Sequence, residues 1–340
     1  MNASTFAEVP SPASPPVAPA SLQARCADLR AALARDILGQ ERLLDRMVVA
    51  LLSGGHMLLE GLPGLAKTTA VKALARAVQG SFRRVQFTPD LLPGDLTGGD
   101  VFLPAEGCSR FVEGPLFHDI VLADEINRAP AKVQSALLEA MQERQVTVGG
   151  HTRPLPPMFL VLATQNPLEQ SGTYPLPEAQ LDRFLLHVVI DYPSAEHERG
   201  VLDRHLALAG DDAPAAHAGP LLDAGAVLLA RRQVRRVHVA GVLRAGIVEL
   251  VRSTRELRAV DPELAGVVDA GASPRATLSL AHAAQALAWL RGRDYVIPDD
   301  VIELAPDVLR HRIVLNPRAG LQGVDADALV RRLVERIEFE

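Results

Sequence analysis

The residues whose types and spacing most clearly suggest a chemical role lie in the segment GLPGLAKT at 61–68. An apolar run at 56–60 comes before it and an alanine-rich stretch follows it, an order that predicts a strand, a tight turn and a helix. Gly61 and Gly64 would let the backbone turn so that several N–H groups point inward, and the helix would add the positive end of its dipole. Such a turn binds phosphate oxygens.

Two side chains complete the predicted phosphate site. Lys67 would bring a full positive charge to the β- and γ-phosphates of a nucleotide, and Thr68 would offer its hydroxyl to Mg²⁺. The common pattern GxxxxGK[ST] has glycine before the lysine, whereas Ala66 stands here, and a residue with a Cβ fits there if its backbone angles are helix-like. The alternative is a glycine-rich turn that begins an ordinary helix. The other residues expected to line this loop are Pro63, Leu65 and Thr69.

A second segment, PLFHDIVLADEINRAP at 115–130, predicts an apolar strand that ends in two acids. Asp124 at the strand end would hold Mg²⁺ through water, and Glu125 beside it would polarise an attacking water molecule. The alternative is an acidic helix cap after a buried strand. That alternative does not explain why both motifs occur at compatible spacing, so the pair indicates hydrolysis of a nucleotide phosphate.

Two further polar residues fit this chemistry. Asn166 ends the apolar run FLVLATQN and is placed to orient the attacking water, although an asparagine after a strand is usually a turn former. Arg183, in PEAQLDRF, comes before the last predicted strand and could reach the γ-phosphate of a neighbouring subunit. Such an arginine contributes roughly 10³–10⁵-fold in rate. Its alternative is a surface salt bridge with Asp182 or Glu178.

Arg275, in GASPRATLSL, opens a predicted helix near the C-terminal end of the chain. A cation is unfavourable at a helix N-terminus because the helix dipole is positive there. A bound anion would offset that cost, so we expect Arg275 to point from a smaller domain toward the nucleotide.

Short apolar runs separated by helices or loops predict a parallel α/β sheet covered by helices on both faces. The expected strands are 56–60, 84–88, 116–123, 159–164 and 184–190, after two helices within 22–52 that Gly39 separates. Beyond Asp191 helical spacing dominates, over 194–208, 240–257, 274–291, 298–311 and 326–336. We therefore expect a disordered Pro/Ala-rich tail at 1–21, a nucleotide-binding core at 22–208, and a connecting helix with an all-α lid at 209–340, after a loop at 211–220.

Composition limits the class of protein. The 340 residues are 48% hydrophobic and 4% aromatic, which is typical of a soluble globular protein, and no apolar run approaches the roughly 18–20 residues of a membrane span. The N-terminus does not resemble a secretory signal, and Cys26 and Cys108 lie far apart, so a cytoplasmic protein is expected. A net charge of −6 makes nucleic acid an unlikely partner. The basic cluster Arg231, Arg232, Arg235 and Arg236 is interpreted as a solvated helix face, and the alternative is a site for an anionic partner.

Together these residues resemble the MoxR family of AAA+ ATPases, from about Ile37 to the C-terminus. The family's Ala-Lys-Thr form of the phosphate loop is present at 61–68. The other matching segments are LADEINRAP at 122–130, ATQNP at 163–167, YPLPEAQLDRF at 174–184, GASPRA at 271–276 and HRI at 311–313.

The resemblance implies a P-loop AAA+ core with a helical lid and a site for ATP and Mg²⁺. It implies that Ile37, Gly39 and Gln40 hold the adenine, that Asn166 is sensor 1, that Arg183 is the arginine finger, and that Arg275 is sensor 2. Whether Arg275 acts within its own subunit or on the next one stays open. Relatives carry two insertions, a loop within the second helix and a β-hairpin before the sensor-1 strand, and 90–117 and 145–157 are expected to be these.

The resemblance also implies function and partners. Family members form rings, usually hexamers, and resemble chaperones that work with von Willebrand factor A domain proteins to remodel or mature protein complexes. The alternatives are a nucleic-acid-linked or chelatase-type motor subunit, and a nucleotide-sensing regulatory module with slow turnover. Client, partner, pathway, ring size and basal turnover rate are left open by the sequence.

Overall fold

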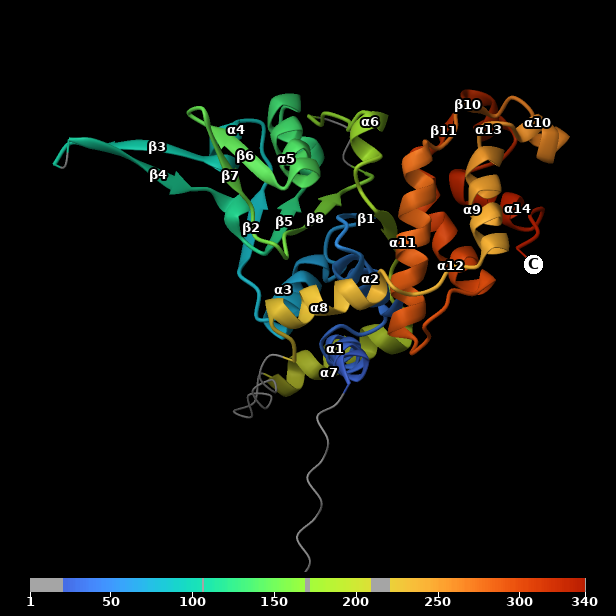
Figure 1. The fold of residues 1–340 in the computed structure, drawn as a ribbon, viewed down its shortest axis with the longest axis horizontal. Helices are drawn as coiled ribbons and strands as arrows, with labels where there is room; N and C mark the ends of the chain where they lie inside the picture. Colours follow the sequence, from blue (N-terminus) through green and yellow to red (C-terminus); the bar gives the residue numbers. More distant parts are fainter. Residues whose placement is uncertain (1–20, 106, 169–171, 209–220, 340) are drawn as a thin grey trace, which may run out of the picture.

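The computed structural model describes residues 21–105, 107–168, 172–208 and 221–339 (Figure 1). The tail predicted at 1–21, apart from Ser21, and the loop predicted at 211–220 lie outside the described residues. Ser21 itself is the N-cap of the first helix, where its hydroxyl accepts a hydrogen bond from the Ala24 N–H at 3.2 Å.

Five parallel strands form the central sheet in the order β2-β5-β8-β1-β9. Their bounds are β1 Met57–Gly61, β2 Phe82–Gln86, β5 Ile120–Asp124, β8 Leu160–Gln165 and β9 Leu186–Ile190. All five predicted strands are confirmed, with ends displaced by a few residues. Parallel sheets are covered on both faces, which explains why these strands are nearly continuous apolar runs.

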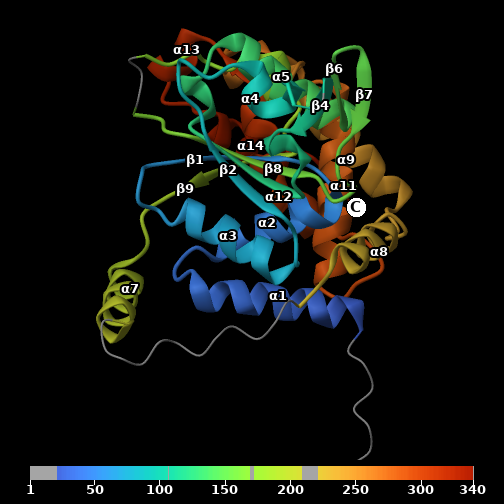
Figure 2. The same cartoon turned by 90° about the vertical axis from the view of Figure 1, so that its left-hand side faces the viewer.

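Side chains alternate between two apolar clusters, one on each face of the sheet. On β1, Met57 and Leu59 pack with the cluster under α1, α2 and α3, whereas Leu58 packs with the cluster around α5. Figure 2 shows α1, α2 and α3 below the sheet and α4 and α5 above it. The bounds are α1 Leu22–Asp36, α2 Glu41–Ser53, α3 Lys67–Ala77, α4 Pro93–Thr97 and α5 Ala131–Glu143.

Both predicted insertions are present as β-hairpins. The first contains β3 (Gly98–Leu103) antiparallel to β4 (Cys108–Glu113), which projects away from the sheet in Figure 1. The expectation of a loop here was therefore incomplete, because residues 98–103 pair with residues 108–113 as an antiparallel ladder. The second hairpin is β6 (Gln145–Val148) with β7 (His151–Pro154), directly before β8, as predicted.

The C-terminal part is helical and lies on the right of Figure 1. Its helices are α9 Gly241–Ser253, α10 Leu257–Val260, α11 Pro274–Leu290, α12 Pro298–Leu309, α13 Pro317–Leu321 and α14 Ala326–Val334. It also contains a short antiparallel ladder of β10 (Val268–Ala270) with β11 (Val314–Leu315), which the sequence did not predict. The remaining elements are α6 Glu178–Leu181, α7 Ala195–Leu208, α8 Ala224–Val234 and the 3₁₀ turns η1 Pro115–Phe117, η2 Ile126–Arg128, η3 Pro262–Leu264 and η4 Arg310–Arg312.

Helix α8 lies beside α2, under the sheet (Figure 1). Arg231 on this helix is only 7% exposed and donates to the carbonyl oxygens of Leu51 (2.8 Å), Pro157 (3.1 Å) and Met158 (3.2 Å). The interpretation of the basic cluster as a solvated face is thus wrong for Arg231. At the end of α2 the Leu51 carbonyl also accepts from the Gly54 N–H at 3.3 Å, so this guanidinium adds a second hydrogen bond where the helix ends. Burial lowers the pKa of Arg231 to about 10.

Candidate functional site

The phosphate loop is built as predicted from the end of β1, a turn and the start of α3. At Gly61 a Cβ would lie 2.9 Å from the Ile190 backbone oxygen, so glycine lets β1 approach β9 closely. Gly64 has φ +86°, a left-handed conformation that glycine adopts without strain. Lys67 is the first residue of α3, and its Nζ donates to the Gly61 carbonyl at 2.6 Å.

Ala66 departs from its predicted geometry. Helix-like backbone angles were the condition under which a residue with a Cβ fits at this position, but Ala66 has φ 55° and ψ 15°, in the left-handed region. A Cβ in that region approaches the following carbonyl oxygen, which costs roughly 1–2 kcal/mol. The surrounding turn and helix therefore hold Ala66 against a local preference, as is common at functional sites.

One pocket gathers the residues predicted to contact phosphate and metal. Its volume is about 350 Å³. It is lined by Pro63, Gly64, Leu65, Ala66, Lys67, Thr68, Thr69, Arg84, Asp124, Glu125, Thr164 and Asn166. Residues of β2, β5 and β8 thus meet the phosphate loop, which follows β1, at one edge of the sheet, where open α/β sheets bind ligands.

The two acids occupy different positions because the chain turns sharply between them. Asp124 ends β5, and Glu125 has φ +57°, which directs its side chain away from the line of the strand. Thr164 on the neighbouring strand fixes both, since its hydroxyl donates to Asp124 Oδ1 at 2.5 Å and accepts from the Glu125 N–H at 2.9 Å. Thr164 is a site residue that the sequence analysis did not identify.

Strand β2 contributes two more residues that sequence reasoning missed. Arg84 donates to Asp124 Oδ2 from Nε (2.9 Å) and Nη2 (2.6 Å), and also to Gln86 Oε1 at 3.0 Å. Gln86 in turn donates to Glu125 Oε2 at 2.6 Å, and Arg128 Nε lies 3.1 Å from the same oxygen. Strand alternation places Arg84 and Gln86 on one face, but nothing in the sequence places that face beside Asp124 and Glu125, which is decided by the pairing of β2 with β5.

Asn166 follows β8 directly and is 8% exposed. Its Oδ1 accepts a hydrogen bond from the Leu168 N–H at 3.1 Å, so the side chain is held by its own loop while it lines the pocket. This placement is compatible with the predicted contact to an attacking water, which stays a prediction.

The donor set fits Mg²⁺. Thr68 and Asp124 bring a hydroxyl and a carboxylate to the same pocket, and Mg²⁺ prefers oxygen ligands, usually keeping several waters and substrate phosphate oxygens. Within the described residues, no group of three or more His, Cys, Asp or Glu side chains could hold a metal ion.

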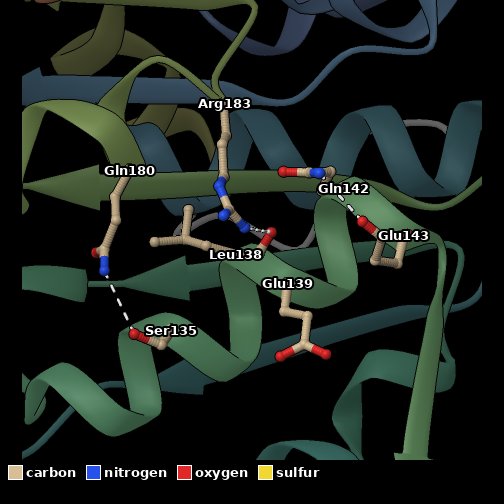
Figure 3. A pocket seen from close by; sticks show the side chains of 7 residues that line it. All are labelled: Ser135, Leu138, Glu139, Gln142, Glu143, Gln180 and Arg183. Carbon is tan, nitrogen blue, oxygen red and sulfur yellow. Dashed lines mark hydrogen bonds between the residues drawn. The ribbon is translucent and has the colours of Figure 1, made fainter.

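Arg183 lies in another pocket, of about 380 Å³, which shares none of its lining residues with the phosphate pocket. Figure 3 shows its guanidinium extending toward α5, where Nη1 donates to the Leu138 carbonyl at 2.8 Å. The alternative of a salt bridge with Asp182 is not what the structure shows, because the Asp182 carboxylate pairs with Arg312 and Arg275.

Arg275 is at the start of α11 but does not line the phosphate pocket of its own chain. Its Nη1 is 3.3 Å from Asp182 Oδ2. The Asp182 carboxylate thus supplies an anion beside Arg275 within the chain, and the contact of Arg275 with nucleotide, in its own subunit or the next, stays a prediction. Arg275 thus contacts the residue that immediately precedes Arg183 in the chain.

The residues expected to hold adenine lie at the junction of α1 and α2. Ile37 is buried, and Gln40 Nε2 donates to the Asp191 carbonyl at 3.0 Å. Gly39 has φ +72°, and a Cβ there would lie 2.8 Å from the His197 side chain. None of the three lines the phosphate pocket, so their contact with adenine stays a prediction.

The described helices include none that is both long and apolar enough to span a membrane.

Comparison with known proteins identifies the class that this fold and site define. Residues 56–186 match the family described as "ATPase family associated with various cellular activities (AAA)", and residues 265–333 match the AAA lid domain. A crystal structure of a protein from Cytophaga hutchinsonii that is assigned as an ATPase superposes with a TM-score of 0.86 at 40% identity, covering 93% of this chain and 95% of that one. The predicted α/β core with a parallel sheet and a lid is confirmed.

Sequence relatives narrow the class to one family. "Chaperone MoxR1" of Mycobacterium tuberculosis is 48% identical over 89% of this chain and 79% of its own length. "Uncharacterized protein YeaC" of Bacillus subtilis is 44% identical over 89% and 91%, and "Protein MoxR" of Paracoccus denitrificans is 34% identical over 86% and 90%. The chain belongs to the MoxR family of AAA+ ATPases. Nucleotide binding and ATP hydrolysis as a general activity come with this class.

Proposed function

We propose that the chain hydrolyses ATP to ADP and phosphate with Mg²⁺, in sites completed by a second copy within a hexameric ring. The observation that carries this proposal is the separation of two pockets. Lys67, Asp124, Glu125 and Asn166 share the phosphate pocket, whereas Arg183 lies in a pocket with no lining residue in common. An arginine that acts on nucleotide from there needs another copy's phosphate pocket.

The roles of the residues follow from their positions. Lys67 and the loop N–H groups would bind the β- and γ-phosphates, and Thr68 with Asp124 would hold Mg²⁺, which supplies charge neutralisation between the phosphates. Glu125 would accept the proton of a water that Asn166 orients. Arg183 of the adjacent copy would stabilise charge on the transferring phosphate.

We further propose that this turnover drives chaperone-like remodelling or maturation of protein complexes, in the cytoplasm and with a von Willebrand factor A domain partner. The family relationship supports the remodelling role, since one relative is named a chaperone. The von Willebrand factor A domain partner is proposed from the family resemblance, and the compartment from the two widely separated cysteines.

A second candidate, a nucleotide-sensing module with slow turnover, is favoured by one observation. Glu125 Oε2 accepts from Gln86 at 2.6 Å and lies 3.1 Å from Arg128 Nε, so in this arrangement protein donors occupy the oxygen that would contact the attacking water. A nucleic-acid-linked or chelatase-type motor has no comparable support, and the net charge of −6 opposes the former.

The test is the ATPase rate per subunit as a function of protein concentration, with mass photometry on the same samples in the presence of ATP. We expect the rate to rise as rings form, because each site then gains Arg183 from its neighbour. A rate that stays constant from verified monomers to verified rings would remove Arg183 from catalysis. Absence of turnover in verified rings would favour the sensing module.

A further inference from the structure

Arg312 belongs to the motif HRI at 311–313, which does not line the phosphate pocket. Its side chain holds the segment that carries Arg183. It lies in the lid turn η4, and its side chain is 1% exposed. Its Nε donates to Asp182 Oδ1 at 2.8 Å, and its Nη2 donates to the carbonyl oxygens of Phe184 (2.5 Å) and Asp182 (3.3 Å). The bonded residues therefore stand on both sides of Arg183.

Only an arginine suits this position. A guanidinium presents five N–H donors in a rigid planar fork, so it can bond a carboxylate and several carbonyls at once, whereas an ammonium group is a compact point charge. Nη1 of Arg312 also reaches the Leu185 carbonyl at 3.4 Å, and Nη2 reaches Ser279 Oγ at 3.2 Å. Burying the charge is expensive unless it is paired, and the Asp182 carboxylate provides that pair.

Asp182 connects the same clamp to the start of α11. Its Oδ2 accepts from the Ser273 hydroxyl at 2.9 Å and lies 3.3 Å from Arg275 Nη1, while Oδ1 accepts from Arg312. Three lid residues thus converge on one carboxylate, which is the residue immediately before Arg183 in the chain. If the lid moves as a rigid body, either the segment that carries Arg183 moves with it or these bonds break.

We propose that Arg312 and Asp182 form a positioning pair that holds Arg183 in place for the neighbouring copy and makes its position follow the lid. This inference rests on the proposed function, in which Arg183 acts on the nucleotide of that copy. Neither residue of the pair touches the nucleotide in this scheme. Both act through the backbone that carries Arg183.

The first test is hydrogen–deuterium exchange of a peptide covering residues 180–186. The N–H groups of Arg183, Phe184 and Leu185 bond to the carbonyls of Gln180, Leu181 and His56, so they report the order of this segment. Arg312→Lys should raise exchange there by about tenfold or more, since the fork is lost. Unchanged exchange would overturn the inference.

Arg310→Lys is the matched control. Arg310 lies two residues before Arg312, is also buried, and bonds Asp307, Asp327 and the His187 carbonyl. It anchors the lid to β9 but not to the segment that carries Arg183. We expect a similar loss of stability with little change in exchange at 182–185, and an equal rise in both variants would contradict a specific clamp.

The second test measures turnover in mixed rings, in which one kind of subunit supplies Arg183 to the active site of the next. Glu125→Gln subunits, which keep Arg183, are mixed with Arg183→Ala subunits, which keep their own acids, and native mass spectrometry confirms mixed rings. Turnover should recover in these rings. Adding Arg312→Lys or Asp182→Asn to the Glu125→Gln subunits should lower the recovered turnover roughly 10–100-fold, because small displacements of a positioned group have effects of that size.

The two proposals fail differently. If the starting mixture recovers turnover and the added substitutions do not lower it, the positioning pair is wrong and the shared site stands. If the starting mixture recovers none, the shared site is wrong and the inference falls with it. Binding of a fluorescent ATP analogue should be the same in all donor subunits, and a loss of binding that matches the lost turnover would also contradict a positioning role. If Arg312→Lys fails to fold, the same measurements on Asp182→Asn test the pair from its other member.

Discussion

Two residues of the phosphate pocket hold strained backbone angles. Ala66 and Glu125 both have positive φ, at 55° and 57°, and neither is a glycine. Such angles persist only where the surrounding structure enforces them. At Ala66 the turn from β1 into α3 is the cause, and at Glu125 the cause is the bond from its N–H to Thr164. The strain is the physical cost of directing N–H groups and a carboxylate into one pocket.

The strain at Ala66 can be measured by removing its Cβ. Ala66→Gly should raise the free energy of unfolding by up to about 1 kcal/mol, because relief of left-handed strain outweighs the added chain entropy. Urea unfolding measures it. Ala70→Gly is the matched control, since Ala70 lies within α3 and is buried, so the same substitution should lower stability by about 1 kcal/mol or more. A loss of stability in both variants would show that Ala66 is unstrained.

Lys67 and Glu125 should separate binding from hydrolysis. Lys67→Ala should weaken nucleotide binding roughly 10–100-fold, the value of a hydrogen bond to a charged group. Glu125→Gln should bind ATP with nearly unchanged affinity and lose roughly 10²–10⁴-fold in turnover, because the amide cannot accept the proton. A fluorescent nucleotide and a phosphate-release assay provide the two readouts. Equal losses of affinity in both variants would contradict this division of roles.

At the scale of elements, a buried histidine joins β1, β8 and α5. His56 Nδ1 accepts from the Val161 N–H at 2.9 Å, so Nε2 carries the proton and donates to the Met141 carbonyl at 3.2 Å. Burial lowers the pKa of His56 to about 3, and the positive charge of Arg144 adds to this effect. The ring is therefore neutral in the folded protein throughout the physiological range.

This histidine predicts how stability depends on pH. In the unfolded chain its pKa is about 6.5, so the stabilising contribution is complete above that pH and is lost as pH falls toward the folded value of about 3. His56→Gln should lower stability at pH 7 and make its decline between pH 6 and 4 shallower by about 1.4 kcal/mol per pH unit. Urea unfolding at several pH values tests this. Parallel curves for the two proteins would refute the assignment.

At the scale of the whole molecule, a buried carboxylate joins the sheet domain to the lid. Asp307 on α12 is fully buried and accepts hydrogen bonds at 2.7 Å from Arg42 and Arg46 of α2 and from Arg310. One apolar cluster also runs without a break from α1–α3 into α11, α12 and α14. The lid is thus fixed to the core by shared packing and by charge.

Removing the charge of Asp307 should loosen this attachment. Asp307→Asn leaves the buried Arg46 and Arg310 without their common carboxylate, which should cost about 3–5 kcal/mol of unfolding free energy. Arg42→Ala is the matched control, because Arg42 bonds the same carboxylate but is half exposed, and it should cost about 1 kcal/mol or less. Chemical unfolding compares them, and similar small losses would mean that the buried pair contributes little.

The order of elements was open to prediction because it depends on local chemistry. Apolar runs, glycine turns and acids at strand ends are neighbours in the sequence, so the five strands, the phosphate loop and the Asp124–Glu125 pair could be predicted. The sequence also indicated Arg183 and Arg275 through their motifs. The family resemblance supplied both insertions.

The tertiary structure alone decided which distant residues meet. Arg84, Gln86 and Thr164 enter the site through the pairing of β2, β5 and β8, which no local pattern specifies. Arg231 and Arg312 are buried because carbonyl groups from other elements surround them, whereas charge alone suggests exposure. The sequence by itself therefore determined which chemical groups the site contains. The packing of separate elements determined which partners hold each charged side chain.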